Sequence, residues 1–455
     1  MTKSLSRIAT ALLFSALGIS ACFADNPIIQ TRYTADPAPM VYHNKVYLYT
    51  GHDEDGSTWF TMNNWRVFSS SDMVNWTDCG SPLSYQTFAW AKGDAWAGQC
   101  IERTGKFYWY VPVKIASGSM AIGVAVSDRP TGPFKDALGH PLVAHSWGDI
   151  DPTVFIDNDG QAYLYWGNPA LYYVKLNKDM TSYDETVGVV AVPLTQESFG
   201  KRTGNKDKAT LYEEGPWFYK RNGLYAMVYA ASGIPENIAY ATSPGPTGPW
   251  TYKGIIMPTE GGSFTNHPGV IDFKGNSYFF YHNGALPRGG GFTRSVCVEQ
   301  FQYHGDGSFP TIKMTGAGVV HGVGHLDPYV RTESETMGWE TGVETEDCSE
   351  GGVDVCSIDN GDSIKVNSVN FGSGAKSFSA SVASETNGGT IEIHLDSLTG
   401  PLAGACAVSS TDGAQKWVTK SCKVSGVKGV HDLYFKFTGD SGSLFHFDWW
   451  KFSKR

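Results

Sequence analysis

The chain has 455 residues, which is enough for two or three domains that each bury their own hydrophobic core. It carries 35 Lys and Arg residues against 45 Asp and Glu residues, a formal charge of −10, and no basic run. This balance argues against a nucleic-acid partner.

The N-terminus has the layout of a secretory signal: basic residues, an apolar run over 8–19, and small residues up to Ala24. We expect residues 1–24 to be removed and the protein to be secreted or periplasmic. The residues before Cys22 also resemble a lipoprotein signal, and in that alternative a lipid on Cys22 would anchor the protein at the cell envelope. We expect membrane association only in that case, since no later segment is suited to crossing a bilayer.

Five segments with the pattern of a β-hairpin recur along the chain at intervals of 53 to 63 residues. They begin at Asp36, Ala97, Asp151, Glu214 and His267. Strand and turn patterns that follow three of them, at 67–76, 124–134 and 238–250, would add outer strands. The period suits one four-stranded blade, so we predict an all-β chain with a five-bladed β-propeller over residues 25–320.

The pattern stops near Val319, and residues 321–330 read as a linker. From Arg331 the composition shifts to Ser, Thr, Gly and Val with short alternating strands. We therefore predict that residues 331–455 form a β-sandwich.

Three acidic residues share the first position of the repeat, which faces the axis of a propeller. Asp36 and Glu214 fall in non-neighbouring blades, which leaves room for a water between a general base and a general acid and predicts inversion at a glycosidic bond. Asp151 lies between them and would raise the pKa of Glu214. Taken singly, the Asp-Pro pairs read as turn chemistry, and Glu213 with Glu214 reads as a solvated pair. The shared position of the three acids favours a functional site.

The segments DPAP at Asp36, DIDPTVFID around Asp151 and EGPW at Glu214 resemble the motifs of glycoside hydrolase family 43. That family contains α-L-arabinofuranosidases, β-xylosidases and arabinanases that act on plant cell-wall polysaccharides. The resemblance implies that Asp36 is the general base, Asp151 the pKa-modulating acid and Glu214 the general acid. It also implies substrate contacts by Trp96, Asn266 and Arg294.

The resemblance implies no catalytic cofactor, but relatives hold a calcium ion near the propeller centre beside a His at the place of His267. A purely structural role for His267 is the alternative. The C-terminal part resembles a family 6 carbohydrate-binding module, whose structural calcium site corresponds to Glu333, Glu335 and Asp448. The period of two predicts that Glu333 and Glu335 lie on one face of a strand.

The C-terminal part departs from that module family at its principal sugar-binding cleft. Ser363 and Ala414 stand where aromatic residues are usual, and His446 stands where Asn is common. Each missing ring removes a stacking contribution of about 0.5 to 1.5 kcal/mol. We predict a weak or inactive cleft, and binding through another face or a structural role stays open.

Export would place the eight Cys residues in an oxidising compartment. The four Cys residues of the last quarter suggest two disulfides, Cys348 with Cys356 and Cys406 with Cys422. The remaining Cys79, Cys100 and Cys297 leave an odd count, so two of them pair or all stay buried thiols.

The shared position of the acids and the resemblance to family 43 together imply an exported, inverting glycosidase that removes α-L-arabinofuranosyl groups from arabinoxylan or a related plant cell-wall polysaccharide. β-D-Xylosidase activity, alone or beside arabinofuranosidase activity, is the alternative. A propeller that binds polysaccharide without cutting it is a third interpretation. We expect a monomer.

Overall fold

The computed structural model describes residues 26–204 and 208–454. Strands dominate it, and the helical elements found there are one 3-10 turn, η1 (Tyr85–Thr87), and one four-residue helix, α1 (Gln196–Phe199). Within these residues no helix has the length and apolar content needed to cross a bilayer. The predicted signal peptide and Cys22 lie outside the described residues.

Five antiparallel sheets follow one another along the first two thirds of the chain. The first contains β1 (Thr34–Tyr42), β2 (Lys45–Asp53), β3 (Met62–Ser70), β4 (Trp76–Asp78) and β5 (Leu83–Ser84). The second contains β6 (Ala91–Gly93), β7 (Gln99–Arg103), β8 (Lys106–Ile115), β9 (Met120–Ser127) and β10 (Lys135–Asp136). The third contains β11 (Thr153–Ile156), β12 (Ala162–Trp166), β13 (Tyr172–Leu176) and β14 (Val190–Ala191).

The fourth sheet contains β15 (Tyr212–Arg221), β16 (Leu224–Ala231), β17 (Asn237–Ser243) and β18 (Thr251–Met257). The fifth contains β19 (Gly269–Phe273), β20 (Asn276–Asn283) and β21 (Ser295–Phe301). The five predicted hairpins are confirmed as β1–β2, β7–β8, β11–β12, β15–β16 and β19–β20.

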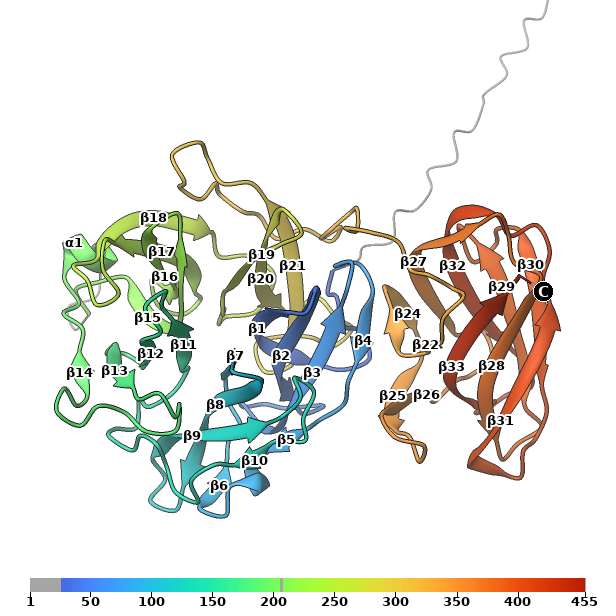
Figure 1. Cartoon of the computed structure of the whole chain (residues 1–455), viewed down its shortest axis with the longest axis horizontal. Helices are drawn as coiled ribbons and strands as arrows, with labels where there is room; N and C mark the ends of the chain where they lie inside the picture. The colour runs from blue at the N-terminus through green and yellow to red at the C-terminus, as the bar shows by residue number, and fades with distance from the viewer. Residues whose placement is uncertain (1–25, 205–207, 455) are drawn as a thin grey trace, which may run out of the picture.

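The first strands of the five hairpins lie next to one another in chain order around a common centre (Figure 1). β1 contacts β7, β7 contacts β11, β11 contacts β15, and β19 returns to β1. β15 and β19 are joined by Trp217, whose Nε1 donates to the carbonyl oxygen of Val270 at 3.1 Å. This radial arrangement is that of a β-propeller, and it brings the equivalent starts of distant strands together.

Large aromatic side chains fill the space between neighbouring sheets. Trp109 is fully buried and meets Tyr49 of the first sheet edge to face, with ring centroids 4.7 Å apart. Tyr165 packs on Phe218 in the same manner between the third and fourth sheets. Each such side chain removes roughly 150 to 250 Å² from water, which holds the sheets in a fixed radial order.

The last part of the chain forms two facing sheets. One contains β22 (Thr332–Glu333), β25 (Glu344–Asp347), β26 (Val353–Cys356), β28 (Ser377–Ser384), β31 (Gly413–Lys423) and β33 (His446–Ser453). The other contains β24 (Trp339–Thr341), β27 (Ser363–Gly372), β29 (Gly389–Leu395), β30 (Leu402–Val408) and β32 (Gly429–Thr438). Phe378, Phe435 and Trp450 pack together in the core, which makes this part a β-sandwich.

The sandwich is docked against the first sheet of the propeller (Figure 1). The short strand β23 (Thr336–Met337) pairs with β4, and Thr345 donates to Asp78 at 2.9 Å. The side chain of Asn75 accepts from the backbone N–H of Asn367 at 2.7 Å and donates to the carbonyl oxygen of Asn367 at 2.9 Å. Because these contacts involve backbone and buried groups, they orient the two parts relative to each other.

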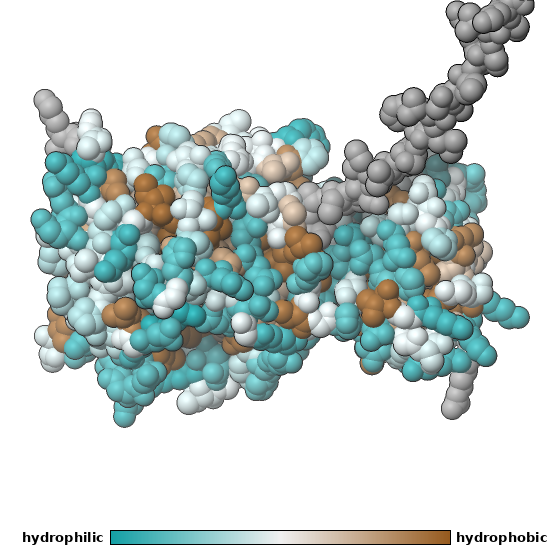
Figure 2. Space-filling view, turned by 90° about the horizontal axis from the view of Figure 1, so that it is seen from above, coloured by the Kyte–Doolittle hydropathy of each residue, from teal (hydrophilic) through white to brown (hydrophobic). Residues whose placement is uncertain are grey.

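The face shown in Figure 2 is largely hydrophilic, with apolar residues scattered in small patches. Large exposed apolar side chains come from separate parts of the chain, such as Trp59, Leu224 and Leu402. Scattered residues of this kind are normal for a protein surface.

The structure corrects one predicted disulfide. In the hairpin β25–β26, Cys356 lies opposite Glu344. At the other end of the hairpin, the backbone N–H of Cys348 donates to the carbonyl oxygen of Gly352. The Cα atoms of Cys348 and Cys356 are therefore offset by four residues along the hairpin, or roughly 13 Å, whereas a disulfide needs Cα atoms within about 7 Å. The Cys348–Cys356 pairing is therefore wrong.

The other cysteines lie in two settings. Cys406 and Cys422 are free thiols in the structure but lie within hydrogen-bonding reach of each other, so that predicted pairing stays a prediction. Cys79, Cys100 and Cys297 are free thiols. Burial raises the pKa of Cys79 to about 12, which makes that thiol unreactive.

Candidate active site

A pocket of about 220 Å³ lies where the inner strands of the propeller begin. All six residues predicted for catalysis and substrate contact line it, together with His267. The polar lining residues are Asp36, Asp151, Asn168, Glu214, Thr265, Asn266, His267 and Arg294. The apolar lining residues are Trp59, Phe60, Met62, Trp96, Ala97, Trp147, Ile150 and Ile234.

Local backbone irregularities aim the three acids into this pocket. Asp36 has a φ of 55° and lies where the pairing of β1 with β2 shifts register, and Asp151 has a φ of 56°. The pairing of β15 with β16 shifts on both sides of Glu214, and Gly215 follows with a φ of 56°. Asp and Gly tolerate this left-handed conformation, and bulges of this kind redirect side chains beside active sites. A Cβ at Gly215 would lie 3.1 Å from the His267 ring.

Asp36 is buried and lies against a cation. Arg294 Nη1 donates to Asp36 Oδ1 at 3.0 Å. His282 Nδ1 accepts from the Asp36 backbone at 3.2 Å while its Nε2 bonds Thr265 O at 2.9 Å, so this buried imidazole is neutral. Burial raises the pKa of Asp36 to about 6, although the positive charge of Arg294 works in the opposite direction. The carboxylate is thus a stronger base than an exposed Asp.

Arg294 is itself held in place by Asp53, which the sequence did not identify. Asp53 Oδ2 accepts from Arg294 Nε at 2.9 Å and Oδ1 accepts from Nη2 at 2.8 Å, in a bidentate pair. Asp53 is fully buried at the end of β2. The guanidinium predicted to contact substrate therefore also fixes and stabilises the Asp36 carboxylate.

Glu214 and its neighbour Glu213 have opposite surroundings. Glu213 pairs with Arg202 and Lys208, whereas Glu214 faces the pocket and accepts a hydrogen bond from Nδ2 of Asn168. Burial raises the pKa of Glu214, and the charge of Glu213 adds to this effect. The proton of Glu214 is thus retained above the pH at which an exposed Glu loses it.

Asp151 interacts electrostatically with both of the other acids, Asp36 and Glu214. Its Oδ2 accepts from the backbone N–H of Gly215 at 3.0 Å, which ties it to the segment that carries Glu214. Burial and the charges of Glu214 and Asp36 raise the pKa of Asp151 well above its ordinary value. Because the charges of Asp151 and Glu214 repel each other, the pair retains a proton.

Trp96, Asn266 and His267 complete the wall. Trp96 Nε1 donates to the carbonyl oxygen of Phe60 at 3.1 Å, which fixes the indole, and the backbone N–H of His267 donates to Asn266 Oδ1 at 2.9 Å. His267 Nδ1 lies 3.9 Å from Asp36 Oδ1. Burial lowers the pKa of His267 to about 3, so this imidazole is neutral. Trp59 and Trp147, which the sequence analysis did not single out, are 58% and 54% exposed at the pocket.

Comparison with known proteins identifies the domain that holds this pocket. The model of the Glycosyl hydrolases family 43 matches residues 24–309. The chain belongs to glycosyl hydrolase family 43. The model of the carbohydrate binding module (family 6) matches residues 333–454. The chain is thus a family 43 glycosidase, with a β-propeller followed by a family 6 β-sandwich.

Individual relatives extend over both parts. The chain is 35% identical to an arabinoxylan arabinofuranohydrolase of Bacillus subtilis (strain 168), over 94% of this chain and 92% of the relative. A crystal structure of a Bacillus subtilis arabinoxylan arabinofuranohydrolase of family 43, in complex with cellotetraose, superposes with a TM-score of 0.82 at 33% identity and covers 95% of this chain and 98% of that one. A xylosidase/arabinosidase of Bacteroides ovatus is 32% identical over 62% of this chain and 95% of its own length.

The three carboxylates predicted for calcium in the family 6 module are arranged differently from the expectation. β22 ends at Glu333 and Glu335 lies in the following turn, so the two residues do not share a strand face. Arg331 bonds Glu333 at 2.9 Å and reaches Asp448 at 3.5 Å. Glu335 Oε2 and Asp448 Oδ2 are buried without hydrogen-bond partners in the structure. Burial raises the pKa of Asp448 to about 6, and the charge of Glu333 acts in the same direction.

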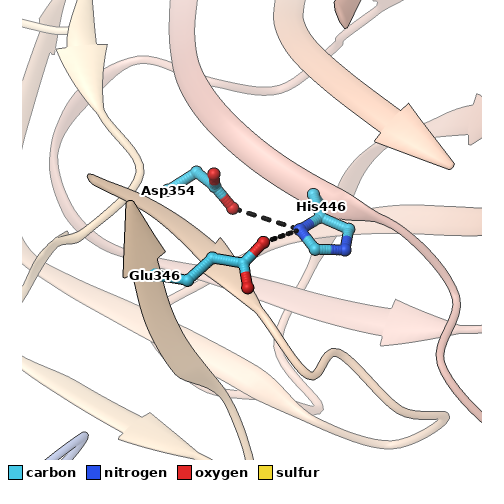
Figure 3. Close-up of side chains that lie close together, drawn as sticks. All are labelled: Glu346, Asp354 and His446. Carbon is cyan, nitrogen blue, oxygen red and sulfur yellow. Dashed lines mark hydrogen bonds and ion pairs between the residues drawn. The ribbon is translucent and has the colours of Figure 1, made fainter. Parts of the chain in front are cut away.

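A second cluster of the module consists of Glu346, Asp354 and His446 (Figure 3). His446 Nδ1 lies 3.2 Å from both Glu346 Oε1 and Asp354 Oδ1. Gln415, the neighbour of Ala414, donates to the same two carboxylates at 3.0 Å. His446, predicted to replace a sugar-binding Asn, is thus engaged by two acids.

Proposed function

We propose that the protein removes α-L-arabinofuranosyl groups from arabinoxylan or a related plant cell-wall polysaccharide, with inversion of configuration. The observation that carries this proposal is the convergence of Asp36, Asp151 and Glu214, from three separate sheets, on one pocket. The names of the similar proteins from Bacillus subtilis support arabinoxylan as the substrate.

In this mechanism the two outer acids divide the proton chemistry. Asp36, ionised beside Arg294, accepts a proton from a water that attacks the anomeric carbon. Glu214, kept protonated by burial, donates its proton to the departing glycosidic oxygen. Asp151 orients the segment of Glu214 through Gly215 and disfavours loss of its proton. No catalytic cofactor is required for these steps.

The shape of the pocket supports attack on single terminal sugar groups. A volume of about 220 Å³ lies below the roughly 300 to 1,000 Å³ typical of drug-sized ligands and suits one monosaccharide. Trp96 and the exposed Trp59 and Trp147 offer flat apolar faces to sugar rings. We assign Trp96, Asn266 and Arg294 to substrate contact within this pocket.

We also propose that the five sheets are the blades of a five-bladed propeller over residues 25–320, followed by a linker at 321–330 and the sandwich at 331–455. The contact of β19 with β1 supports closure of the ring after the fifth sheet. Residues 1–24 would direct export, with lipidation of Cys22 as the alternative. The scattered apolar surface residues support a monomer.

Calcium is proposed as a structural ion in two places. In the sandwich, the unpartnered carboxylate oxygens of Glu335 and Asp448 suit a hard cation, with Glu333 at the rim. In the propeller, the neutral imidazole of His267 could bind the ion directly or accept a hydrogen bond from a water that the ion holds. In both places the ion would supply positive charge and rigidity.

β-D-Xylosidase activity is the second candidate, favoured by the similarity to a xylosidase/arabinosidase. A side-by-side assay of the purified protein on aryl α-L-arabinofuranoside and aryl β-D-xyloside separates the two. We expect faster turnover of the arabinoside, and release of arabinose from arabinoxylan. Equal or faster turnover of the xyloside would put β-xylosidase first, and no turnover of either would favour a polysaccharide-binding propeller.

A further inference from the structure

Glu236 is a buried acid behind the pocket to which the mechanism above gives no task. It precedes β17, is only 3% exposed, and lies near Glu214 in the same sheet. Ala230 of β16 is paired with Glu214 on one side and with Ile238 of β17 on the other. The register therefore brings residue 236 to the end of the sheet at which Glu214 faces the pocket.

The carboxyl of Glu236 has two distinct oxygens. Oε2 accepts from the backbone N–H of Asn266 at 2.7 Å, and Asn266 lines the pocket. Oε1 is buried and accepts from no protein N–H or hydroxyl group in the structure. The carboxyl of Glu236 is, however, within hydrogen-bonding reach of the Glu214 carboxyl.

Two carboxyl groups can share a hydrogen bond only when at least one of them carries a proton. The charged groups that act most strongly on Glu236 are Glu214, Glu213 and Asp151, all acidic, and Glu213 is already paired with Arg202. No ion pair found among the described residues includes Glu236. Burial and the charge of Glu214 raise the pKa of Glu236 well above its ordinary value.

Glu214, in contrast, has groups that stabilise its ionised form. Asn168 donates to it, and the positive charge of Arg294 favours its carboxylate. When the two acids share one proton, Glu236 therefore holds it and Glu214 carries the charge.

We propose that Glu236 is a positioning residue for the hydrolysis: its proton stays on Glu236 and forms a hydrogen bond to the carboxylate that Glu214 becomes, while its other oxygen fixes Asn266. In the step, the Glu214 O–H bond breaks as its proton moves to the leaving oxygen. The Glu236 O–H bond remains intact, and only the strength of its hydrogen bond changes. This inference rests on the proposed role of Glu214 as general acid.

The test compares Glu236→Gln with Glu236→Ala in the full-length protein. Gln keeps a neutral N–H donor for Glu214 and a carbonyl oxygen for Asn266, so kcat on arabinoxylan should stay within about threefold of wild type with an unchanged pH profile. Ala removes the donor, and kcat should fall about 10- to 100-fold. The alkaline limb of the profile should then move to higher pH, because the Glu214 carboxylate loses a stabilising partner.

A second substrate separates this role from simple packing. From a dinitrophenyl arabinofuranoside the dinitrophenolate ion departs without protonation, so Glu236→Ala should slow hydrolysis of this substrate much less than hydrolysis of arabinoxylan. Equal losses on both substrates with an unchanged pH profile would overturn the proposal. It would also be overturned if Glu236→Gln moved the alkaline limb to lower pH, since that result means that wild-type Glu236 acts through a negative charge.

If Glu236→Ala does not fold, the pH profile of Glu236→Gln alone tests the role of Glu236. All values are measured relative to wild type on whichever glycoside the wild-type protein hydrolyses. An inactive wild-type protein would contradict the proposed function, whereas an active wild type with an unaffected Ala variant would contradict only the role of Glu236.

Discussion

The propeller pocket and the Glu346–Asp354–His446 cluster of the sandwich both gather acids, but they balance their charges differently. In the cluster, Asp354 and Glu346 face His446, whose pKa they raise despite the opposite effect of burial, and Gln415 bonds both. Among the described residues that line the pocket, Arg294 is the only Lys or Arg, and it already pairs with Asp53. Balanced charges hold a structure together, whereas unbalanced buried acids are poised for proton transfer.

The largest loss of activity should come from replacing Glu214, which lines the pocket. Its neighbour in β15, Glu213, is instead paired with Arg202 and Lys208, so the two residues show the same contrast within one strand. Glu214→Gln should reduce arabinose release from arabinoxylan by about 10³-fold or more, because the leaving oxygen loses its proton donor. The melting temperature should stay the same or rise, since a buried acid is removed. Initial rates and thermal melts measure both.

The matched control is Glu213→Gln. It should keep turnover within a few fold but cost about 3 to 5 kcal/mol of stability, since the buried Arg202 loses its negatively charged partner. Retained turnover in Glu214→Gln would refute the assignment of the general acid.

The unbalanced charge of the pocket should also appear in the pH dependence of kcat/KM. Below pH about 6, the pKa of Asp36, this carboxylate takes up a proton and no longer accepts one from water. The rate should therefore fall about tenfold for each pH unit below that value. A pH series on an aryl glycoside, with circular dichroism to monitor folding, checks this, and a constant rate down to pH 4.5 would contradict it.

Removing the positive partner from the Glu346–Asp354–His446 cluster should lower the stability of the sandwich and leave the rate of hydrolysis unchanged. His446→Ala leaves the fully buried Asp354 without its charged partner and should cost about 1 to 3 kcal/mol. Turnover of a small aryl glycoside at a temperature where the variant is folded should not change. His431→Ala, which removes a surface pair with Asp396, is the control and should change stability by less than about 1 kcal/mol. Similar losses in the two variants would contradict the special status of the cluster.

The smallest effect concerns the sugar-binding cleft. Ala414→Trp should restore one stacking ring and strengthen retention of the full-length protein on insoluble xylan by about 2- to 10-fold. Lys423→Trp, at the exposed far end of β31, is the control for added apolar surface. Strong retention of the unaltered protein that depends on the surroundings of Ala414 would contradict the prediction of a weak cleft.

The sequence predicted the three acids because a propeller repeats one strand position around an axis, so Asp36, Asp151 and Glu214 could be aligned without coordinates. It did not reveal Asp53, Asn168 or Glu236. Asp53 lies where β2 enters a loop, and the other two lie in connections between strands, whose conformations follow no period.

Two errors in the sandwich have a common cause. The period of two placed Glu333 and Glu335 on one strand face, but a turn separates them. The four Cys residues of the last quarter suggested a disulfide between Cys348 and Cys356, but the register of β25 with β26 keeps these two residues apart. Both inferences depended on strand ends and register, which hydrogen bonds between strands determine and local sequence does not.

The central claim is a single displacement by a water activated at Asp36, opposite the proton donor Glu214. Proton NMR of the first arabinose released from arabinoxylan tests it directly, because the anomer present before mutarotation records the face of attack. The account predicts β-L-arabinofuranose as the first product. Initial appearance of the α-anomer would show retention and would contradict the assigned roles of both acids.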